Sequence, residues 1–328
     1  MKEHFAARLD LFVQNNQQIK KAFAWKSGQI NRLAALLYTV ENKAADLDAI
    51  RDSSELIKSS TGLFSTFRGN LSVCIAALLS LSGDRKTQLS DTLAVYELLK
   101  ERKLRASDYL VAAAYQIAAH SAFDQHQRMA DRTRQFYDSM KEYHRFLTGQ
   151  DDYIFSAMLA LSDLEPEQGA ARMEQLYTEL KPEFLSGNSV QALTQVLALG
   201  AETPGAAARV LALRDAFRSR GLRMDREYTL SSLGVLSLLP ADDETLVQDI
   251  SDTHDYLRTQ KGFGSWSVTK QELLLLSAAL VSYKHIEAVQ SGILASALST
   301  SLTNIVIAQQ TAIAVAAASS AAAASSSH

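Results

Sequence analysis

The feature that most constrains the fold of this chain is an internal repeat of about forty residues. Seven apolar segments each open on a polar or acidic residue and continue for about ten residues rich in Ala, Leu and Val. They begin near Gln29, Asn70, Asp108, Asp152, Ser189, Glu227 and Val268, at intervals of about 37 to 44 residues. Repeats of this length are typical of helical arrays, in which each hairpin buries its apolar face against its neighbours.

A second, more amphipathic stretch follows each apolar segment. Met173, Tyr177 and Leu180, for example, recur at the helical spacing of three and four. The chain has only 14 Gly and 4 Pro residues, too few for the many turns of an all-β fold. We therefore predict an all-α protein of about seven α/α helical hairpins. They form either a solenoid or curved superhelix, or a ring closed into an α/α toroid, because a small rotation per repeat decides between the two.

The ends of the chain differ from the repeats and predict three parts. Residues 1–28 form an N-terminal capping helix, residues 29–285 the repeat domain, and residues 286–328 an uncharged C-terminal helix with an Ala/Ser-rich tail. The C-terminal helix is expected to bury Ile293, Leu298, Leu302 and Ile305 against the repeats. Polar residues interrupt it too often for a transmembrane span. A weak contact of this segment with a membrane or a second copy stays open.

Three Tyr residues occupy one slot of the amphipathic helices: Tyr96, Tyr137 and Tyr177. In register, their rings either stack a ligand or form a packing ladder between neighbouring helices, and we favour the packing ladder. On the same helix as Tyr137, we expect His144 to lie on a charged outer surface.

Several short motifs resemble those of a bacterial family described only as a domain of unknown function, number four thousand and three. They are Phe23-Ala24-Trp25, Gly62-Leu63-Phe64, Tyr96-x-x-Leu99, Ser107-Asp108-Tyr109, Leu147-Thr148-x-x-Asp151-Asp152-Tyr153 and Gln309-Gln310. The resemblance covers nearly the whole chain and implies no activity, cofactor or site residue.

Composition limits the classes of partner. The net charge is −3 and the sequence pI is about 6.2, so no domain-wide positive field attracts nucleic acid. The only cysteine, Cys74, lies in an apolar run and is expected in the core. No Cys/His cluster has zinc spacing, and we expect no metal and no cofactor. The N-terminal pattern is not that of a signal peptide, which favours the cytoplasm.

A row of acidic–aromatic pairs is the best candidate for a site. Asp108-Tyr109, Asp152-Tyr153 and Glu227-Tyr228 stand at the starts of apolar helices, and Asp151 adds a further carboxylate. Stacked repeats would bring these pairs to one rim, where carboxylates can act as general acid and base, as in glycoside hydrolysis. The structural alternative is that each acid caps a helix N-terminus while the Tyr anchors the first turn.

Two function classes follow from these observations. We favour a binding or scaffold protein that uses the surface of the helical array to bind an unknown protein or small molecule. The alternative is a glycoside-processing-like enzyme on an α/α toroid, with Asp108, Asp151, Asp152 and Glu227 as catalytic candidates and Tyr109, Tyr153 and Tyr228 as ligand-binding candidates.

Overall fold

A computed structural model describes residues 3–200, 205–288 and 306–307 of the chain, and the all-α prediction is confirmed for these residues. They form fourteen α-helices, joined in places by short 3-10 turns, with no β-strand in the described ranges. The helices are α1 (Glu3–Ala22), α2 (Gly28–Val40), α3 (Leu47–Ser60), α4 (Ser72–Leu81), α5 (Arg85–Glu101), α6 (Asp108–His120), α7 (His126–Tyr143), α8 (Tyr153–Ala160), α9 (Pro166–Leu180), α10 (Gly187–Leu199), α11 (Ala206–Ser219), α12 (Leu230–Leu238), α13 (Asp243–Thr259) and α14 (Lys270–Ala288).

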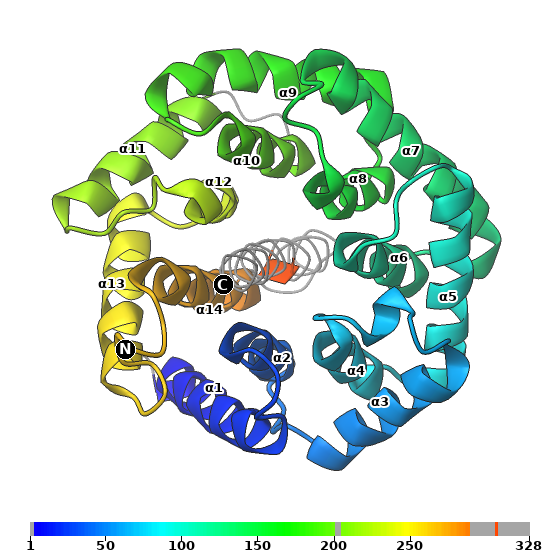
Figure 1. The fold of residues 1–328 in the computed structure, drawn as a ribbon. Helices are drawn as coiled ribbons and strands as arrows, with labels where there is room; N and C mark the ends of the chain where they lie inside the picture. The colour runs from blue at the N-terminus through cyan, green and yellow to red at the C-terminus, as the bar shows by residue number, and fades with distance from the viewer. Residues whose placement is uncertain (1–2, 201–204, 289–305, 308–328) are drawn as a thin grey trace, which may run out of the picture.

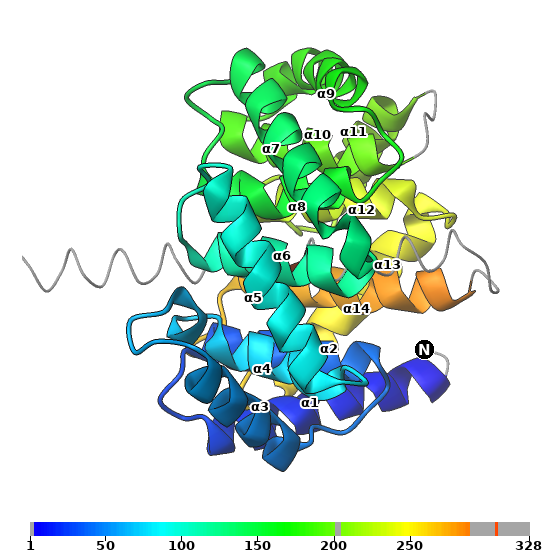
Figure 2. The same cartoon turned by 90° about the vertical axis from the view of Figure 1, so that its right-hand side faces the viewer.

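The helices lie in two concentric layers around a common centre. Figure 1 shows the odd-numbered helices on the outside and the even-numbered helices on the inside. Each outer helix leads through a short connection into an inner helix that runs back beside it. Figure 2 views the same arrangement from the side, with the N-terminus of α1 on the right. Because outer and inner helices alternate in direction, all outer-to-inner connections lie at one rim and all inner-to-outer connections at the other.

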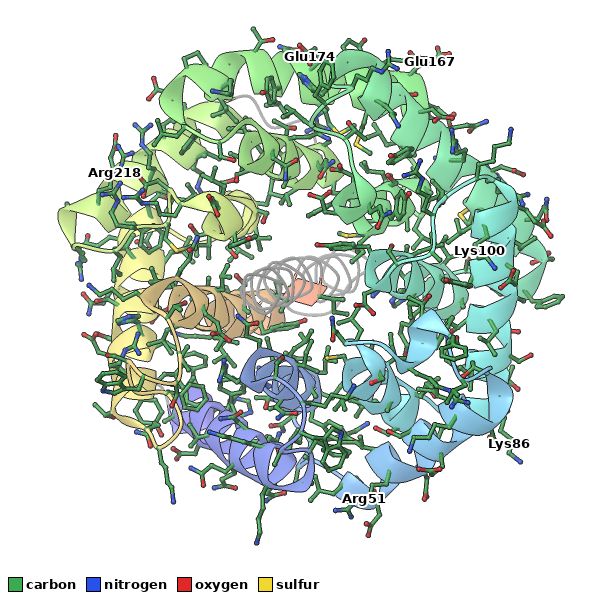
Figure 3. The ribbon with its side chains drawn as sticks, in the orientation of Figure 1. Arg51, Lys86, Lys100, Glu167, Glu174 and Arg218 are labelled. Carbon is green, nitrogen blue, oxygen red and sulfur yellow. The ribbon has the colours of Figure 1, made fainter. Side chains whose placement is uncertain are left out.

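Burial follows the two kinds of helix that the sequence contains. All ten residues from Tyr109 to Ala118 of α6 are buried, as expected of a helix that is apolar on most sides. The outer helices bury one stripe only; in α13 this stripe includes Leu246, Ile250 and Leu257. Charged residues on the outer helices, such as Arg51 and Arg218, point away from the ring (Figure 3).

Arginines on three outer helices hold the C-terminal ends of the inner helices that follow them. The Arg132 side chain donates to the carbonyl oxygens of Ala160 and Leu164 at 3.1 and 2.6 Å. Arg209 donates to those of Ser237 and Leu239, both at 2.9 Å, and Arg172 reaches the end of α10 in the same way. The last carbonyls of a helix have no partner within the helix, so these side chains satisfy them.

The first and last hairpins contact each other directly. Arg32 of α2 and Glu272 of α14 form an ion pair of 2.7 Å, and both side chains are at least 95% buried. On the outer layer, the Tyr256 hydroxyl of α13 donates to the Asp10 carboxylate of α1. Helices that are about 240 residues apart in the sequence therefore lie side by side.

The three Tyr residues of the predicted ladder each contact another ring. The ring centroids are separated by 5.1 Å in Tyr96–Phe67, 5.2 Å in Tyr137–Tyr153 and 4.1 Å in Tyr177–His144. The prediction for His144 is wrong, because its side chain is only 19% exposed and lies 2.7 Å from Glu174. Helix α7 ends at Tyr143, and the backbone of His144 leaves the helical conformation. Its side chain thereby turns from the outer surface onto Tyr177 of the next hairpin.

Most of the predicted C-terminal part falls outside the described residues. This applies to Ile293, Leu298, Leu302 and Ile305 and to the Ala/Ser-rich tail. Val306 and Ile307 are described, and their side chains are buried in the main core cluster. In Figure 1 these two residues lie inside the circle of helices. Within the described ranges, no helix combines the length and the apolar character that a membrane crossing needs.

Candidate functional site

The candidate carboxylates all lie where an outer-to-inner connection enters an inner helix. Asp108 is the first residue of α6. Asp151 and Asp152 form part of the 3-10 turn that leads into α8, and Glu227 opens the corresponding turn before α12. The three connections belong to different hairpins but to the same rim of the ring. The local environments of the four carboxylates nevertheless differ.

Asp152 is buried and fully engaged by its own surroundings. Its Oδ1 accepts hydrogen bonds from the side-chain amides of Gln195 and Gln191 at 2.6 and 3.2 Å, and its Oδ2 accepts from the Gly149 N–H at 2.8 Å. Burial raises the pKa of Asp152 to about 7, with a further contribution from the negative charge of Asp151. The hydrogen bonds act in the opposite direction because they stabilise the charged form.

Asp151 and two Tyr residues gather beside this buried carboxylate. Asp151 accepts a hydrogen bond of 3.0 Å from Asn188 at the start of α10. Burial raises the pKa of Tyr109, and the charge of Asp151 and the neighbouring Tyr228 raise it further. Because Tyr109 and Tyr228 come from α6 and the turn before α12, three hairpins contribute to this cluster. The structure thus brings Asp151, Asp152, Tyr109 and Tyr228 together.

Asp108 stabilises the neighbouring connection instead. Burial raises its pKa, while hydrogen bonds from the backbone of Leu71 and Asn70 and the charge of Lys26 lower it. The Lys26 ammonium donates to the Gly69 carbonyl at 3.1 Å. A Cβ at Gly69 would lie 2.7 Å from Asp108 Oδ1, so only glycine permits this close approach. Asp108 therefore has a structural partner in the preceding hairpin.

Of the remaining two candidates, Tyr153 lies apart from the cluster, whereas Glu227 adjoins Tyr228, whose pKa is raised by burial and by the charge of Glu227. Tyr153 faces the outer layer, where its ring packs on Tyr137 and its hydroxyl accepts a hydrogen bond of 3.1 Å from the Arg105 N–H. Glu227 is exposed to solvent. The described residues contain no group of three or more His, Cys, Asp or Glu side chains placed to hold a metal ion.

A mainly apolar cavity lies elsewhere on the same rim. Its volume is about 590 Å³, and it is lined by residues of the α1–α2 connection, α3 and the start of α4, including Phe23, Lys26, Ile57 and Phe67. A shallower depression of about 790 Å³ lies between α3 and the start of α5. None of the four candidate carboxylates lines either of these two cavities.

Exposed apolar side chains are concentrated on the rim that carries the outer-to-inner connections. Among the described residues, eight large apolar side chains are exposed, and seven of them lie at this rim: Trp25, Leu63, Phe64, Tyr143, Phe146, Leu185 and Trp266. Phe64 and Phe146 are each 98% exposed. The eighth residue, Phe123, lies at the opposite rim, in the connection between α6 and α7. These seven residues come from five of the seven outer-to-inner connections or the helix ends beside them.

The same rim carries an excess of positive charge. The seven connections 23–27, 61–71, 102–107, 144–152, 181–186, 220–229 and 260–269 contain eleven Lys and Arg and five Asp and Glu. The described inner-to-outer connections contain one Lys and seven Asp and Glu residues. Several of these acids, such as Asp46, Asp84 and Asp242, accept hydrogen bonds from the first turn of an outer helix. We call the basic and apolar side the cationic rim.

No single sequence motif marks the residues of the cationic rim as a set. Trp25 and Phe64 occur in the motifs of the family resemblance, whereas Phe146, Leu185 and Trp266 do not. The signal that identifies them is positional: each is a large apolar residue just beyond the end of an amphipathic helix. Such a residue lies outside the helical stripe that faces the core, so its side chain can point into solvent.

The described residues define an all-α protein with two layers of helices and a polarised pair of rims. The chain belongs to the family described as "Protein of unknown function (DUF4003)", which matches residues 15–312. No curated protein and no solved structure is similar enough to the chain to match it.

Proposed function

We propose that this chain is a binding protein built as a closed α/α toroid, with the cationic rim as its binding surface. The closure is supported by the contacts of α1 with α13 and of α2 with α14. The seven hairpins are then structural repeats, and their outer-to-inner connections form one continuous belt. Neighbouring connections contact each other along it, as Lys26 with Gly69 and Arg105 with Tyr153 do.

The single observation that carries this proposal is the coincidence of exposed apolar side chains and positive charge on one rim. Soluble proteins expose scattered apolar residues without any special role. Here seven of the eight exposed large apolar side chains that the structure describes lie on one of the two rims, so they are not scattered. A large exposed apolar surface marks a site of interaction. The acids of the opposite rim have a local role as helix caps, whereas the exposed Phe64 and Phe146 have no structural role that requires exposure.

The enzyme alternative has less support from the geometry. Both oxygens of Asp152 are occupied by hydrogen bonds from the protein itself, Asp108 interacts with the neighbouring connection, and Glu227 is exposed to solvent. A general acid must reach the proton acceptor on its substrate. The two cavities described above offer no approach to these carboxylates.

Site-specific photo-crosslinking in cells tests the proposed binding surface. A photoreactive residue is placed at Phe146 on the cationic rim and, as a matched control, at Phe123 on the opposite rim. We expect covalent adducts with protein, lipid or another macromolecule at position 146 and few or none at position 123. Adducts of equal yield at both positions, or none at position 146, would overturn the proposed function.

A further inference from the structure

We infer that the partner of the cationic rim is the surface of a lipid bilayer that contains anionic headgroups. The inference rests on the proposed function, because it names the partner for the same surface. The seven exposed apolar side chains of the rim, here called the apolar tips, are not evenly spaced around it. They project from two separate stretches of the ring: the seventh, first and second outer-to-inner connections, and the fourth and fifth. A bilayer is a planar apolar phase that each tip can enter separately, whereas a folded partner would need a matching ring of pockets.

The residue types suit the boundary between lipid and water. Trp25 in the first hairpin, Trp266 in the last hairpin and Tyr143 combine a large apolar ring with a polar N–H or O–H group. Rings of this kind are enriched at the headgroup level of membranes. Phe64 and Phe146 add apolar rings without polar groups, which suits the deeper part of the same boundary.

The charges between the apolar tips complement anionic lipids. Lys103, Arg105, Arg145 and Arg226 are exposed and form no ion pair within the part of the chain that the structure describes. Their long aliphatic stems can lie along apolar surface while the charged ends reach headgroup phosphates. Attraction to anionic lipid and burial of apolar area add to each other in peripheral membrane binding.

A nucleic acid is a weaker match to the same rim. Single-stranded nucleic acid binds basic grooves through aromatic side chains on which bases stack. Leu63 and Leu185 offer no aromatic face. The basic cavity on this rim, lined by Lys26, Arg51, Lys58 and Arg68, is confined to the first two hairpins and does not continue around the rim. Aliphatic tips are useful in lipid, where only apolar area counts.

Intrinsic fluorescence reports directly on this contact, because the chain contains two Trp residues and both lie on the cationic rim. The protein is mixed with vesicles of phosphatidylcholine alone and of phosphatidylcholine with phosphatidylglycerol. With the anionic vesicles we expect a blue shift of the emission and quenching by brominated acyl chains, and added salt should weaken both. Neutral vesicles should give little change. No blue shift with anionic vesicles would overturn the inference.

Vesicle co-sedimentation of variants assigns the contact to the rim. The variant with Phe64→Ser, Phe146→Ser and Leu185→Ser retains both Trp residues and should lose at least about tenfold in partitioning. The matched control, Phe123→Ser, should change partitioning less than about twofold. The pair Arg105→Glu with Arg145→Glu should also weaken binding, whereas Lys43→Glu on the opposite rim should not. Melting curves of each variant confirm that it is folded. Equal losses in the rim and control variants would contradict the inference.

The outcomes separate this inference from the proposed function. Adducts at position 146 that contain protein or RNA but no lipid, with no binding to anionic vesicles, would overturn the bilayer as partner and leave the rim as the binding surface. The absence of any adduct at position 146 would overturn both. Lipid adducts at position 146 together with the Trp blue shift support both.

Discussion

Asp152 shows how a single buried carboxylate couples the stability of this protein to pH. Its pKa of about 7 lies above the ordinary value of 3.8 because the side chain is buried beside Asp151. The folded state therefore holds a proton on this group between about pH 4 and pH 7, where the unfolded chain has released it. Stability from this group is highest when the group is protonated and falls as pH rises through this interval.

The variant Asp152→Asn tests this coupling. For the wild-type protein, we expect the free energy of unfolding to decrease between about pH 4 and pH 7, by up to about 1.4 kcal/mol per pH unit from this group. Asn does not titrate, so the variant should lose this part of the slope in denaturant titrations at several pH values. The exposed Glu227→Gln serves as the control for removal of one carboxylate. An unchanged slope in Asp152→Asn would show that Asp152 is not the group responsible.

The residue scale is also where the sequence is least informative about the site. Asp108, Asp152 and Glu227 occupy equivalent places in the repeat, and the pattern predicts one environment for all three. The structure gives them three different ones, because the partners come from distant positions: Gln191 and Gln195 for Asp152, and the 69–71 backbone for Asp108. Local spacing carries no information about such partners.

At the scale of the elements, the hydrophobic period predicts the helices well. The predicted starts of the seven apolar segments lie within three residues of an observed inner helix; the segments at Asp152 and Glu227 open on a short 3-10 turn first. The hydrophobic period predicts the helices because burial on all sides, or on one stripe, is a property of the whole helix. The place where a helix stops depends on single residues, which is why the position of His144 just after α7 is predicted wrongly.

The Tyr ladder gives a test at this scale. Tyr137 is 7% exposed and packs on Tyr153, so Tyr137→Ala should cost roughly 3–5 kcal/mol of unfolding free energy, as removal of a buried aromatic ring does. Tyr143 is on the same helix but half exposed, and Tyr143→Ala should cost less than about 0.5 kcal/mol. Chemical denaturation of both variants makes the comparison. Equal costs would mean that the buried face of α7 is assigned wrongly.

At the scale of the whole molecule, the average charge conceals the feature that matters. A net charge of −3 indicates no attraction to anionic partners. The ring nevertheless separates basic connections from acidic ones, because every outer-to-inner connection emerges on the same side. This separation follows from topology, so it becomes visible only once the direction of each helix is known. The repeat likewise does not determine whether the array is open or closed, because the contact that supports closure joins Arg32 and Glu272, which are 240 residues apart.

The proposed binding surface depends on closure of the ring, because only a closed ring makes the seven connections one continuous rim. Cysteines at Asp10 and Tyr256, in a Cys74→Ala background, place one thiol on α1 and one on α13 where the two side chains form a hydrogen bond. The control pair places cysteines at Tyr256 and at Asp138 of α7, across the ring (Figure 1). A short bis-maleimide, followed by digestion and mass spectrometry of the monomer, detects the link. We predict an intramolecular link between positions 10 and 256 and none between 138 and 256. A monomer without the 10–256 link would contradict the closed ring.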